Sequence, residues 1–522
     1  MISRRALVPV FVAGLATMIL VLECPVPLIA QPYEPGAVAP SRPKLKRLPL
    51  PPPKIDKVVP NQVVVKYKEN SLPPKTAIRQ RDEKLRDLGE VLRRKFNAES
   101  ISTHPDLGWV LMKLPPSLLF TSVISDLAED ELIEYATPDY EITFHGHTTA
   151  PPADWLWTNH FESFYPTPYP SYPYLWGLDK IGMEQAWNLS NSQGGKILIA
   201  ILDGAINYLH PDLGGNYDNT IGEKSYCTYP ASGNALDHGT HVAGIIAARG
   251  DNGSLSTDST FIVGVNRTAK FIPVRIACPA PSLANAIVGI NYAKSKGAAV
   301  INASWGVYLS QSALIDPNSP VSQLVSTLRT AIMNADMTLL VASAGNENRN
   351  FDASSDPKIF PQMFGLDNVI VVAATDPDDA LWVVGDPSSS DFGSNFGKTT
   401  VDIAAPGMNI FSVLPQSQFG TMGTPIQKFV SVADGTSAAA PFVAGCAALL
   451  QSRQLAIHPF SPFTPQQLKS ILRDTGDSLS GMVAGWVGSG RRLNCHHALQ
   501  QVQEQGYVDV VPPMAPTALR VY

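Results

Sequence analysis

Two histidines three positions apart, His238 and His241, begin an apolar run of small residues, HGTHVAGIIAAR. Imidazoles at this spacing can bind a metal ion together, or one can act as a catalytic base while the other packs in the core. A metal site needs further ligands, and no carboxylate follows His241 at a spacing typical of metal binding. The pair alone still leaves metal binding, base catalysis and simple packing open.

An aspartate and a serine stand where acyl transfer would need them. Asp203 ends the apolar run ILIAILD, and Ser437 lies in ADGTSAAAPFVAG, where Gly435 and Thr436 predict a turn before a helix. Backbone N–H groups at a helix start favour an anion, such as the oxygen of an attacked carbonyl. A serine nucleophile needs a base to take its proton, and an imidazole base needs a carboxylate to fix its tautomer. Together with His238, these residues could therefore perform nucleophilic catalysis.

Alternating strands and helices are predicted around these residues. The continuous apolar run KILIAILDG is typical of a parallel strand covered on both faces. The alternation predicts a doubly wound α/β domain, a parallel sheet with flanking helices, whose chemistry lies at the carboxyl ends of the strands. Further strands are predicted at KFIPVRIAC, AAVINASWG, MTLLVASAGN and NVIVVAAT, and helices at HGTHVAGIIAAR, SLANAIVGINYAKSKG, QLVSTLRTAIMNAD, AAAPFVAGCAALLQSR and TPQQLKSILRDTG.

The N-terminal part of the chain has a different organisation. Arg4 and Arg5 precede an apolar run that ends at Leu22, which indicates a secretory signal, with an uncleaved membrane anchor as the alternative. NQVVVKYK, GWVLMKLP and LIEYATPDYEI, with helices near 77–96 and 116–129 between them, predict a small β-α-β-α-β module. The net charge of −6 with no basic face argues against nucleic acid as a partner.

Four cysteines remain after the signal region. Cys446 and Cys495 lie in small-residue helical runs, which is typical of buried free thiols. Cys227 and Cys278 lie in or beside loops and could pair in an oxidising compartment. The spacing of the four matches no zinc site.

The order Asp, His, Ser, with small residues around each, resembles the subtilisin-like serine proteases, or subtilases. The resemblance covers about residues 174–500 and implies that Asp203 orients His238, that His238 is the base and that Ser437 is the nucleophile. It makes His241 a structural histidine, and it gives Asn346 and the Ser437 N–H the role of oxyanion hole. The matching blocks are LWGLDKIGMEQAW, AILDGAINYLHPDL, HGTHVAGIIAA, VINASWG, ASAGNEN, DFGSNFGKTTVDIAAPG, GTSAAAPFVAG and GSGRRLNCHHAL.

The same resemblance implies how substrate and propeptide bind. Ser304, Trp305 and Gly306 match the family's substrate strand, which pairs with an extended peptide main chain. The upstream module looks like an inhibitory, ferredoxin-like propeptide, so we expect a self-processing zymogen whose first cut falls between about Phe144 and Asp154. The expected division is a signal peptide or anchor at 1–30, a proline-rich linker at 31–60, the propeptide at 61–146, a second linker at 147–173, the peptidase domain at 174–507 and a tail at 508–522.

The expected protein is thus a secreted or extracytoplasmic serine endopeptidase. It would act on proteins or peptides, be inhibited by its own propeptide, and contact a membrane only if the N-terminal segment stays uncleaved. Asp203-Gly204-Ala205 replaces the family's Asp-Ser/Thr-Gly, and this departure supports one alternative, a catalytically silent binding protein. An ester hydrolase is a third possibility, against which the peptide-binding strand argues.

Its chemistry needs no cofactor, but a structural calcium ion is possible. Asp212 and Asn252 match positions of family calcium ligands. Calcium takes six to eight oxygen ligands, and the insertion SLSTDST interrupts the loop that contains Asn252.

Overall fold

The computed structural model describes most of the chain between Ile55 and Glu504. The described residues all lie within one compact unit, Pro49–Tyr522. The predicted signal segment, the linker beyond residue 149, Cys227, Cys278, Asn252 and the tail lie outside the described residues. The described ranges are 55–144, 147–149, 175–190, 197–210, 212–226, 234–249, 262–277, 280–353, 357–384, 392–413, 430–480 and 485–504.

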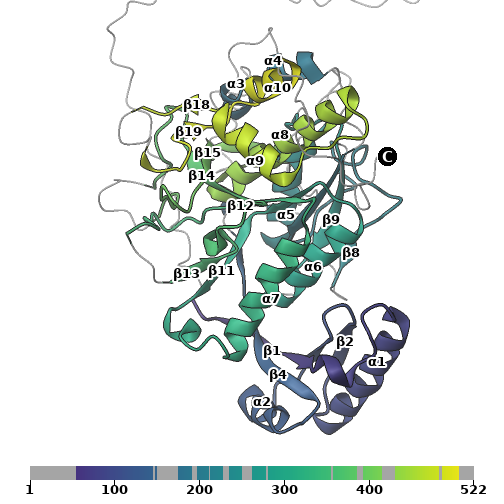
Figure 1. Ribbon diagram of the computed structural model, residues 1–522. Coiled ribbons are helices and arrows are strands. Elements are labelled where there is room, and N and C mark those ends of the chain that lie inside the picture. Colours follow the sequence, from purple (N-terminus) through teal and green to yellow (C-terminus); the bar gives the residue numbers. More distant parts are fainter. Residues whose placement is uncertain are drawn as a thin grey trace, which may run out of the picture. The chain divides into compact units, whose positions relative to one another are not determined.

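A largely parallel sheet forms the centre of the larger domain (Figure 1). Its order is β18-β19-β15-β14-β12-β10-β7-β9-β8, and only the β18–β19 pair at one edge is antiparallel. Every residue of the central strands is buried, as their continuous apolar sequences predict. The strands are β7 (Leu198–Asp203), β8 (Lys224–Ser225), β9 (Lys270–Arg275), β10 (Val300–Ala303), β12 (Leu339–Ser343), β14 (Val369–Thr375), β15 (Ile403–Pro406), β18 (Asp477–Ser478) and β19 (Arg491–Arg492).

Helices cover both faces of this sheet. Ile199 and Ile201 of β7 join one core cluster with α5 and α8, while Leu198 and Leu202 join a second cluster with α6 and α7. Successive residues of a strand point to opposite faces, so β7 contributes to both layers. This confirms the expected doubly wound fold. The helices are α3 (Trp176–Lys180), α4 (Met183–Ser190), α5 (Asn234–Ala247), α6 (Leu283–Ser295), α7 (Pro320–Asn334), α8 (Thr436–Ile457), α9 (Pro465–Asp474) and α10 (Cys495–Glu504).

The N-terminal module is a four-stranded antiparallel sheet, β2-β3-β1-β4, with two helices. Its order is β-α-β-β-α-β, so the predicted β-α-β-α-β order was wrong by one strand. The missed strand has the sequence SISTH, in which only His104 is buried, because an edge strand needs no apolar run. The elements are β1 (Val58–Tyr67), η1 (Glu69–Ser71), α1 (Ile78–Lys95), β2 (Ser100–His104), β3 (Trp109–Lys113), α2 (Phe120–Ala128) and β4 (Ile133–Tyr140).

The two faces of the module's sheet have different neighbours. Val63 and Val65 pack into the module's own core, with α1 and α2. Val64 and Trp109 point the other way and join the cluster that contains α6 and α7 of the larger domain. The module therefore covers its second face only by packing against these helices.

Two small sheets join the end of the module to the larger domain. One has the order β13-β11-β5 and the other β16-β17-β6. Each receives a short strand from the segment that follows β4, so both small sheets end in a strand that precedes the larger domain in the chain. The strands are β5 (Thr143–Phe144), β6 (His147–Thr149), β11 (Trp305–Leu309), β13 (Lys358–Phe360), β16 (Ile410–Val413) and β17 (Val430–Asp434), and the nearby short helices are η3 (Ser312–Leu314) and η4 (Gln362–Phe364).

A disulfide bond joins Cys446 on α8 to Cys495, the first residue of α10. The prediction of two buried free thiols was therefore wrong. Both side chains are indeed buried. Local sequence indicates burial, but it does not show that two cysteines 49 residues apart in the chain come together.

Within the ranges given above, which exclude the N-terminal apolar segment, the helices are all too short or too polar to cross a bilayer.

Candidate active site

Asp203 is the last residue of β7 and is fully buried at the carboxyl end of the sheet. Its Oδ1 accepts a hydrogen bond of 2.7 Å from the Gly204 N–H and lies 2.7 Å from Nδ1 of His238. A Cβ atom on Gly239 would lie 2.5 Å from the Ala205 carbonyl oxygen. Glycine at 239 therefore lets α5 approach the turn after Asp203 closely, and the Gly204-Ala205 turn is compatible with the contact between Asp203 and His238.

His238 lies inside α5, because the helix begins at Asn234 rather than at His238 as predicted. Its side chain is buried, and its Nε2 has no hydrogen-bond partner among the described residues. The ring of Phe144 stacks on the imidazole, with centroids 4.9 Å apart and planes at 22°. One ring nitrogen is thus held by Asp203, and the other makes no hydrogen bond within the described residues.

Ser437 is the second residue of α8 and is almost fully buried. Gly435 precedes the helix with φ +127°, a backbone conformation that favours glycine. The Ser304 hydroxyl donates to the Ser437 carbonyl at 3.1 Å, and Asn302 donates to the same hydroxyl oxygen at 2.9 Å. These bonds fix the start of α8 against the carboxyl end of β10.

Asn346 follows β12 and is oriented by the residue next to Ser437. Its Oδ1 accepts from the Thr436 N–H and from the Thr436 hydroxyl, both at 2.9 Å. Because both bonds use the oxygen, the NH₂ group is the end of the amide that can donate to an anion. The preceding Gly345 has φ +102°, and a Cβ atom there would lie 2.4 Å from Asn395 Nδ2.

Sequence analysis missed Glu347, which anchors the backbone of Asn346. Its Oε2 accepts from the Asn346 N–H at 3.1 Å, from Tyr308 OH at 2.8 Å and from Asn395 Nδ2 at 2.6 Å. Burial raises the pKa of Glu347 and raises that of Tyr308 well above its ordinary value. The only sequence signal was an acidic residue inside the block ASAGNEN, whose partners are distant in the chain.

His241, the second histidine of the pair, makes contacts different from those of His238. His241 is buried, and its Nε2 lies 3.1 Å from the carbonyl oxygen of Ile410 in β16. Its own carbonyl accepts a hydrogen bond from the Ser412 hydroxyl at 2.7 Å. These contacts tie α5 to β16.

The three residues expected to bind substrate have different surroundings. Trp305 and Gly306 pair through the main chain with Phe144 and Thr143 of β5. The Trp305 side chain is buried and donates to the Leu202 carbonyl at 3.0 Å. Ser304 lies just before the strand and supports Ser437 instead. The segment paired with Trp305 and Gly306 is thus the end of the chain's own N-terminal module.

Asp212 is fully buried, and its N–H donates to His210 Nδ1 at 3.1 Å. The other expected calcium ligand, Asn252, lies outside the described residues. No group of three or more histidine, cysteine, aspartate or glutamate side chains suitable for a metal ion occurs in the described ranges. The structural calcium ion therefore stays a prediction.

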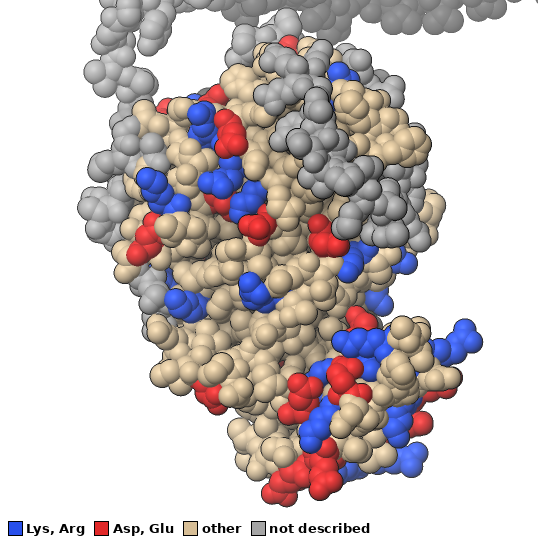
Figure 2. Space-filling model, in the orientation of Figure 1, with Lys and Arg blue, Asp and Glu red and all other residues tan. Residues whose placement is uncertain are grey.

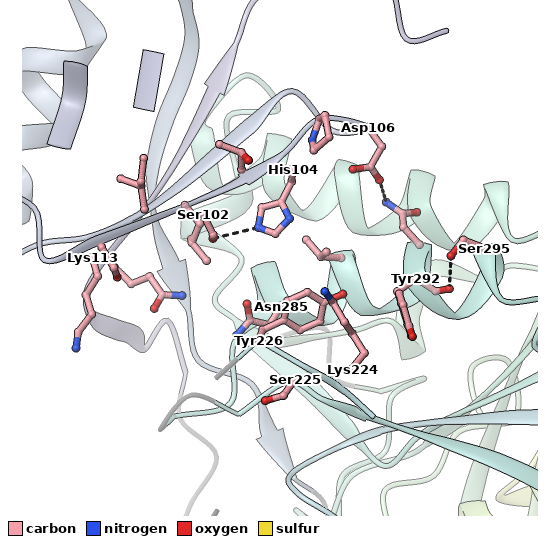
Figure 3. Close-up of a pocket in the computed structure, with 18 of the residues that line it drawn as sticks. Ser102, His104, Asp106, Lys113, Lys224, Ser225, Tyr226, Asn285, Tyr292 and Ser295 are labelled. Atoms are coloured by element: carbon pink, nitrogen blue, oxygen red, sulfur yellow. Dashed lines mark hydrogen bonds between the residues drawn. The ribbon is translucent and has the colours of Figure 1, made fainter. Parts of the chain in front are cut away.

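A pocket of about 950 Å³ lies away from these residues, between the module and the larger domain (Figure 3). Ser102 and His104 of β2 line one side, and Asn285 and Tyr292 of α6 line another. Burial lowers the pKa of His104 to about 4. The pocket is a hollow in the interface between module and domain, and none of the expected catalytic residues line it.

Comparisons with known proteins agree with this architecture. Residues 194–490, more than half of the chain, match the model of the subtilase family, Peptidase S8. Residues 52–139 match the model of the fervidolysin N-terminal prodomain.

Two proteases illustrate the similarity in sequence. Thermitase from Thermoactinomyces vulgaris is 31% identical over 340 residues, which cover 63% of this chain and 99% of thermitase. Fervidolysin from Fervidobacterium pennivorans is 30% identical over 338 residues, which cover 60% of this chain and 41% of fervidolysin.

Two solved structures share the fold. The crystal structure of fervidolysin, described as a keratinolytic enzyme related to subtilisin, matches with a TM-score of 0.55 and 23% identity over 85% of this chain and 61% of that one. The epidermin leader peptide processing serine protease from Staphylococcus aureus matches with a TM-score of 0.57 and 20% identity over 85% of this chain and 98% of that one. The expected fold and enzyme class are confirmed: the chain belongs to the subtilase family of subtilisin-like serine proteases.

Proposed function

We propose that this subtilase is an exported serine endopeptidase, made as a zymogen that processes itself. One observation carries the proposal. His238 contacts Asp203 through one ring nitrogen at 2.7 Å, while its other ring nitrogen has no partner among the described residues. A strand of the module lies over this imidazole, paired with β11.

In the proposed mechanism the Ser437 hydroxyl attacks the carbonyl carbon of the peptide bond and His238 Nε2 takes its proton. His238 then gives that proton to the leaving amine, and a water molecule hydrolyses the acyl-enzyme by the same path in reverse. Asp203 keeps the imidazole oriented and stabilises its protonated form. The Asn346 amide and the Ser437 N–H donate to the oxyanion, and losing one such donor costs about 3 kcal/mol of transition-state stabilisation.

The positions of β5 and β6 support self-processing and narrow the expected site of the first cut. Phe144, which stacks on His238, pairs with Trp305, and His147 pairs with Asp434, which lies shortly before Ser437 in the chain. The chain therefore passes from one small sheet to the other between Phe144 and His147. We infer that the first bond cut lies in this short interval, at the start of the stretch from Phe144 to Asp154.

Processing of a Ser437→Ala precursor tests the proposal. The variant should accumulate as an uncut chain that lacks only its signal segment, whereas the natural chain should be cut between Phe144 and His147, as N-terminal sequencing would reveal. An intramolecular cut should also proceed at a rate that does not depend on dilution. Cutting of Ser437→Ala at the same bond in a protease-deficient host would show that another protease matures the protein.

The catalytically silent binding protein remains the second candidate, because of the Gly204-Ala205 departure. A fluorophosphonate probe separates the two, since it labels only a serine activated by a neighbouring base. Labelling of the mature protein that disappears in Ser437→Ala supports the enzyme. A mature protein that binds peptides but takes up no label supports the silent binder.

Export rests on the charged and apolar N-terminal segment, which lies outside the described residues. We propose that this segment is a cleaved signal. Because self-processing would remove residues 1–30 in any case, the test uses the uncut Ser437→Ala precursor. Mass spectrometry of this precursor recovered from the medium should give a mass that excludes residues 1–30. Retention of these residues in a membrane fraction would identify an anchor instead.

A further inference from the structure

The edge of β11 that receives β5 also binds a second, separate segment of the module. Further along this edge, the Asp56 N–H donates to the Tyr308 carbonyl at 2.9 Å. The Asp56 carboxylate accepts from the Ser310 N–H, also at 2.9 Å. Tyr308 and Ser310 follow Gly306 at alternate positions, and alternate residues of a strand direct their backbone groups to the same edge.

The segment that contains β5 does not itself continue along β11. The pairing of Gly306 with Thr143 would place Glu141 opposite Tyr308, because antiparallel partners advance in opposite directions. Instead, the Glu141 N–H donates to the Lys57 carbonyl at 2.8 Å, and Glu141 forms an ion pair of 3.3 Å with the Lys57 ammonium. Asp56 therefore takes the place on β11 that a continuous peptide strand would fill.

Aspartate has the donor and the acceptor that the position beside Tyr308 and Ser310 requires. One residue supplies an N–H to the Tyr308 carbonyl and a carboxylate to the Ser310 N–H, so both edge groups are satisfied. Asp56 has φ +50°, and aspartate adopts this left-handed conformation more readily than most residues. Alanine has no acceptor side chain for the Ser310 N–H, and lysine offers only donors.

We propose that Tyr308 and Ser310 form an additional substrate subsite, which the module blocks with Asp56 in the zymogen. In the mature enzyme this subsite binds one residue of the substrate, two positions N-terminal to the substrate residue that pairs with Gly306. The subsite prefers an acidic side chain at that position. The substrate backbone N–H donates to the Tyr308 carbonyl, and the carboxylate accepts a charge-assisted hydrogen bond from the Ser310 N–H. This inference rests on the proposed function, because it takes β11 as the substrate strand.

Peptides that copy the chain's own processing region test the preference. The sequence TPDYEITFHGHTTA, residues 137–150, would be made as an internally quenched substrate with Asp, Asn, Ala or Lys in place of Glu141. The mature enzyme should cleave the Asp peptide with a kcat/KM about threefold to tenfold above that of the Ala peptide, the range of one net hydrogen bond. The Lys peptide should be the poorest, and equal values for Asp, Ala and Lys would overturn the subsite.

Variants at Ser310 separate its backbone from its side chain. Ser310→Pro removes the N–H and should abolish the preference for Asp over Ala. Ser310→Ala keeps the N–H and should retain it, although it removes the hydroxyl that accepts from Ala313 N–H at 3.2 Å. A preference that survives in folded Ser310→Pro would contradict the proposed donor, and the peptide comparison on the natural enzyme remains decisive if that variant does not fold.

The zymogen gives an independent measurement. Asp56→Ala in the full chain should release the module sooner and shorten the lag before activity, whereas Asp56→Asn, which keeps an acceptor oxygen, should stay close to the natural chain. An unchanged lag in Asp56→Ala would overturn the blocking role. An enzyme that cleaves the peptides without preference refutes only the subsite, while a mature protein that cleaves none of them and takes up no fluorophosphonate refutes the proposed function together with it.

Discussion

The candidate catalytic centre and the surface that holds the module are built in different ways. Asp203, Ser437 and Asn346 lie at the ends of buried elements and are held by hydrogen bonds within the larger domain. The module instead has a highly charged surface (Figure 2), and it covers the second face of its sheet only by packing on α6 and α7. A site fixed within one domain would thus keep its geometry if the module dissociated.

Polar contacts between module and domain involve two ionisable groups, Asp139 and His104, whose pKa values are shifted by burial. Asp139 of β4 is fully buried and accepts hydrogen bonds from the Ser282 hydroxyl, from the Ala284 N–H at 3.0 Å and from Gln62 at 2.7 Å. In effect, a carboxylate of the module caps the start of α6. His104 of β2 is buried near Tyr226, with ring centroids 6.4 Å apart.

The largest effect should come from removing the base of the catalytic centre. His238→Ala should lower kcat by about 10⁶-fold, the loss found when one member of such a catalytic unit is removed. Folding should be retained, as circular dichroism would show. His241→Ala is the matched control, and it should lower the melting temperature while turnover persists. Activity that survives His238→Ala but disappears when zinc is stripped would revive the metal site.

The second prediction concerns the stability of the larger domain. Replacing Cys446 and Cys495 together by alanine should lower the free energy of unfolding by about 2–4 kcal/mol, because the disulfide restricts the unfolded chain. Urea unfolding of the mature enzyme would measure this loss. The affinity for the module should hardly change, since both cysteines lie within the larger domain. A loss of module binding as large as the loss of stability would mean that domain and module are not independent.

A third prediction concerns the pH dependence of module binding. Burial lowers the pKa of His104 from 6.5 to about 4. The contribution of His104 to the affinity for the module is therefore lost as pH falls from 6.5 to about 4. Burial raises the pKa of Asp139 from 3.8 to about 6, so its contribution is present in acid and is lost as pH rises through that window. These two effects nearly cancel between pH 4 and 6. The affinity of the natural chain for its module should therefore hardly change across that range.

A variant at either residue alone should show one of the two opposite effects of pH on module binding. With His104→Gln, binding of the cut module to Ser437→Ala enzyme should tighten as pH falls, by up to about tenfold per pH unit. With Asp139→Asn it should weaken as pH falls, by a similar factor. Nearby charges also shift the pKa of His104, since Asp106 and Asp82 raise it and Lys224 lowers it. Two variants with the same slope would contradict this assignment, and calorimetry across the pH range would measure both.

The smallest effect is expected at the turn after Asp203. Changing Gly204-Ala205 to Ser-Gly should leave kcat/KM within about tenfold, which corresponds to about 1.4 kcal/mol. The reason is that Asp203 already contacts His238 at 2.7 Å with the natural turn in place. A gain of about a hundredfold would mean that the natural catalytic centre is impaired and would favour the silent binding protein.

Local sequence was sufficient for much of the fold, because burial on both faces requires continuous apolar strands such as the one that ends at Asp203. It was sufficient for the family as well, since the residue types around Asp203, His238 and Ser437 occur in a specific order. It failed at SISTH, where an exposed edge strand carries no apolar pattern. It also failed for the disulfide, because burial of two cysteines does not reveal that they meet.

The tertiary structure alone decided the contacts between residues far apart in the chain. The pairing of Phe144 with Trp305, the hydrogen bonds of Glu347 with Tyr308 and Asn395, and the position of Asp56 on β11 all join segments that no local period connects. Each depends on backbone groups at a strand edge or on a buried carboxylate, and the partners of such groups are set by three-dimensional packing. The sequence by itself determined which candidate catalytic groups the chain carries, and only the folded chain determined what lies against them.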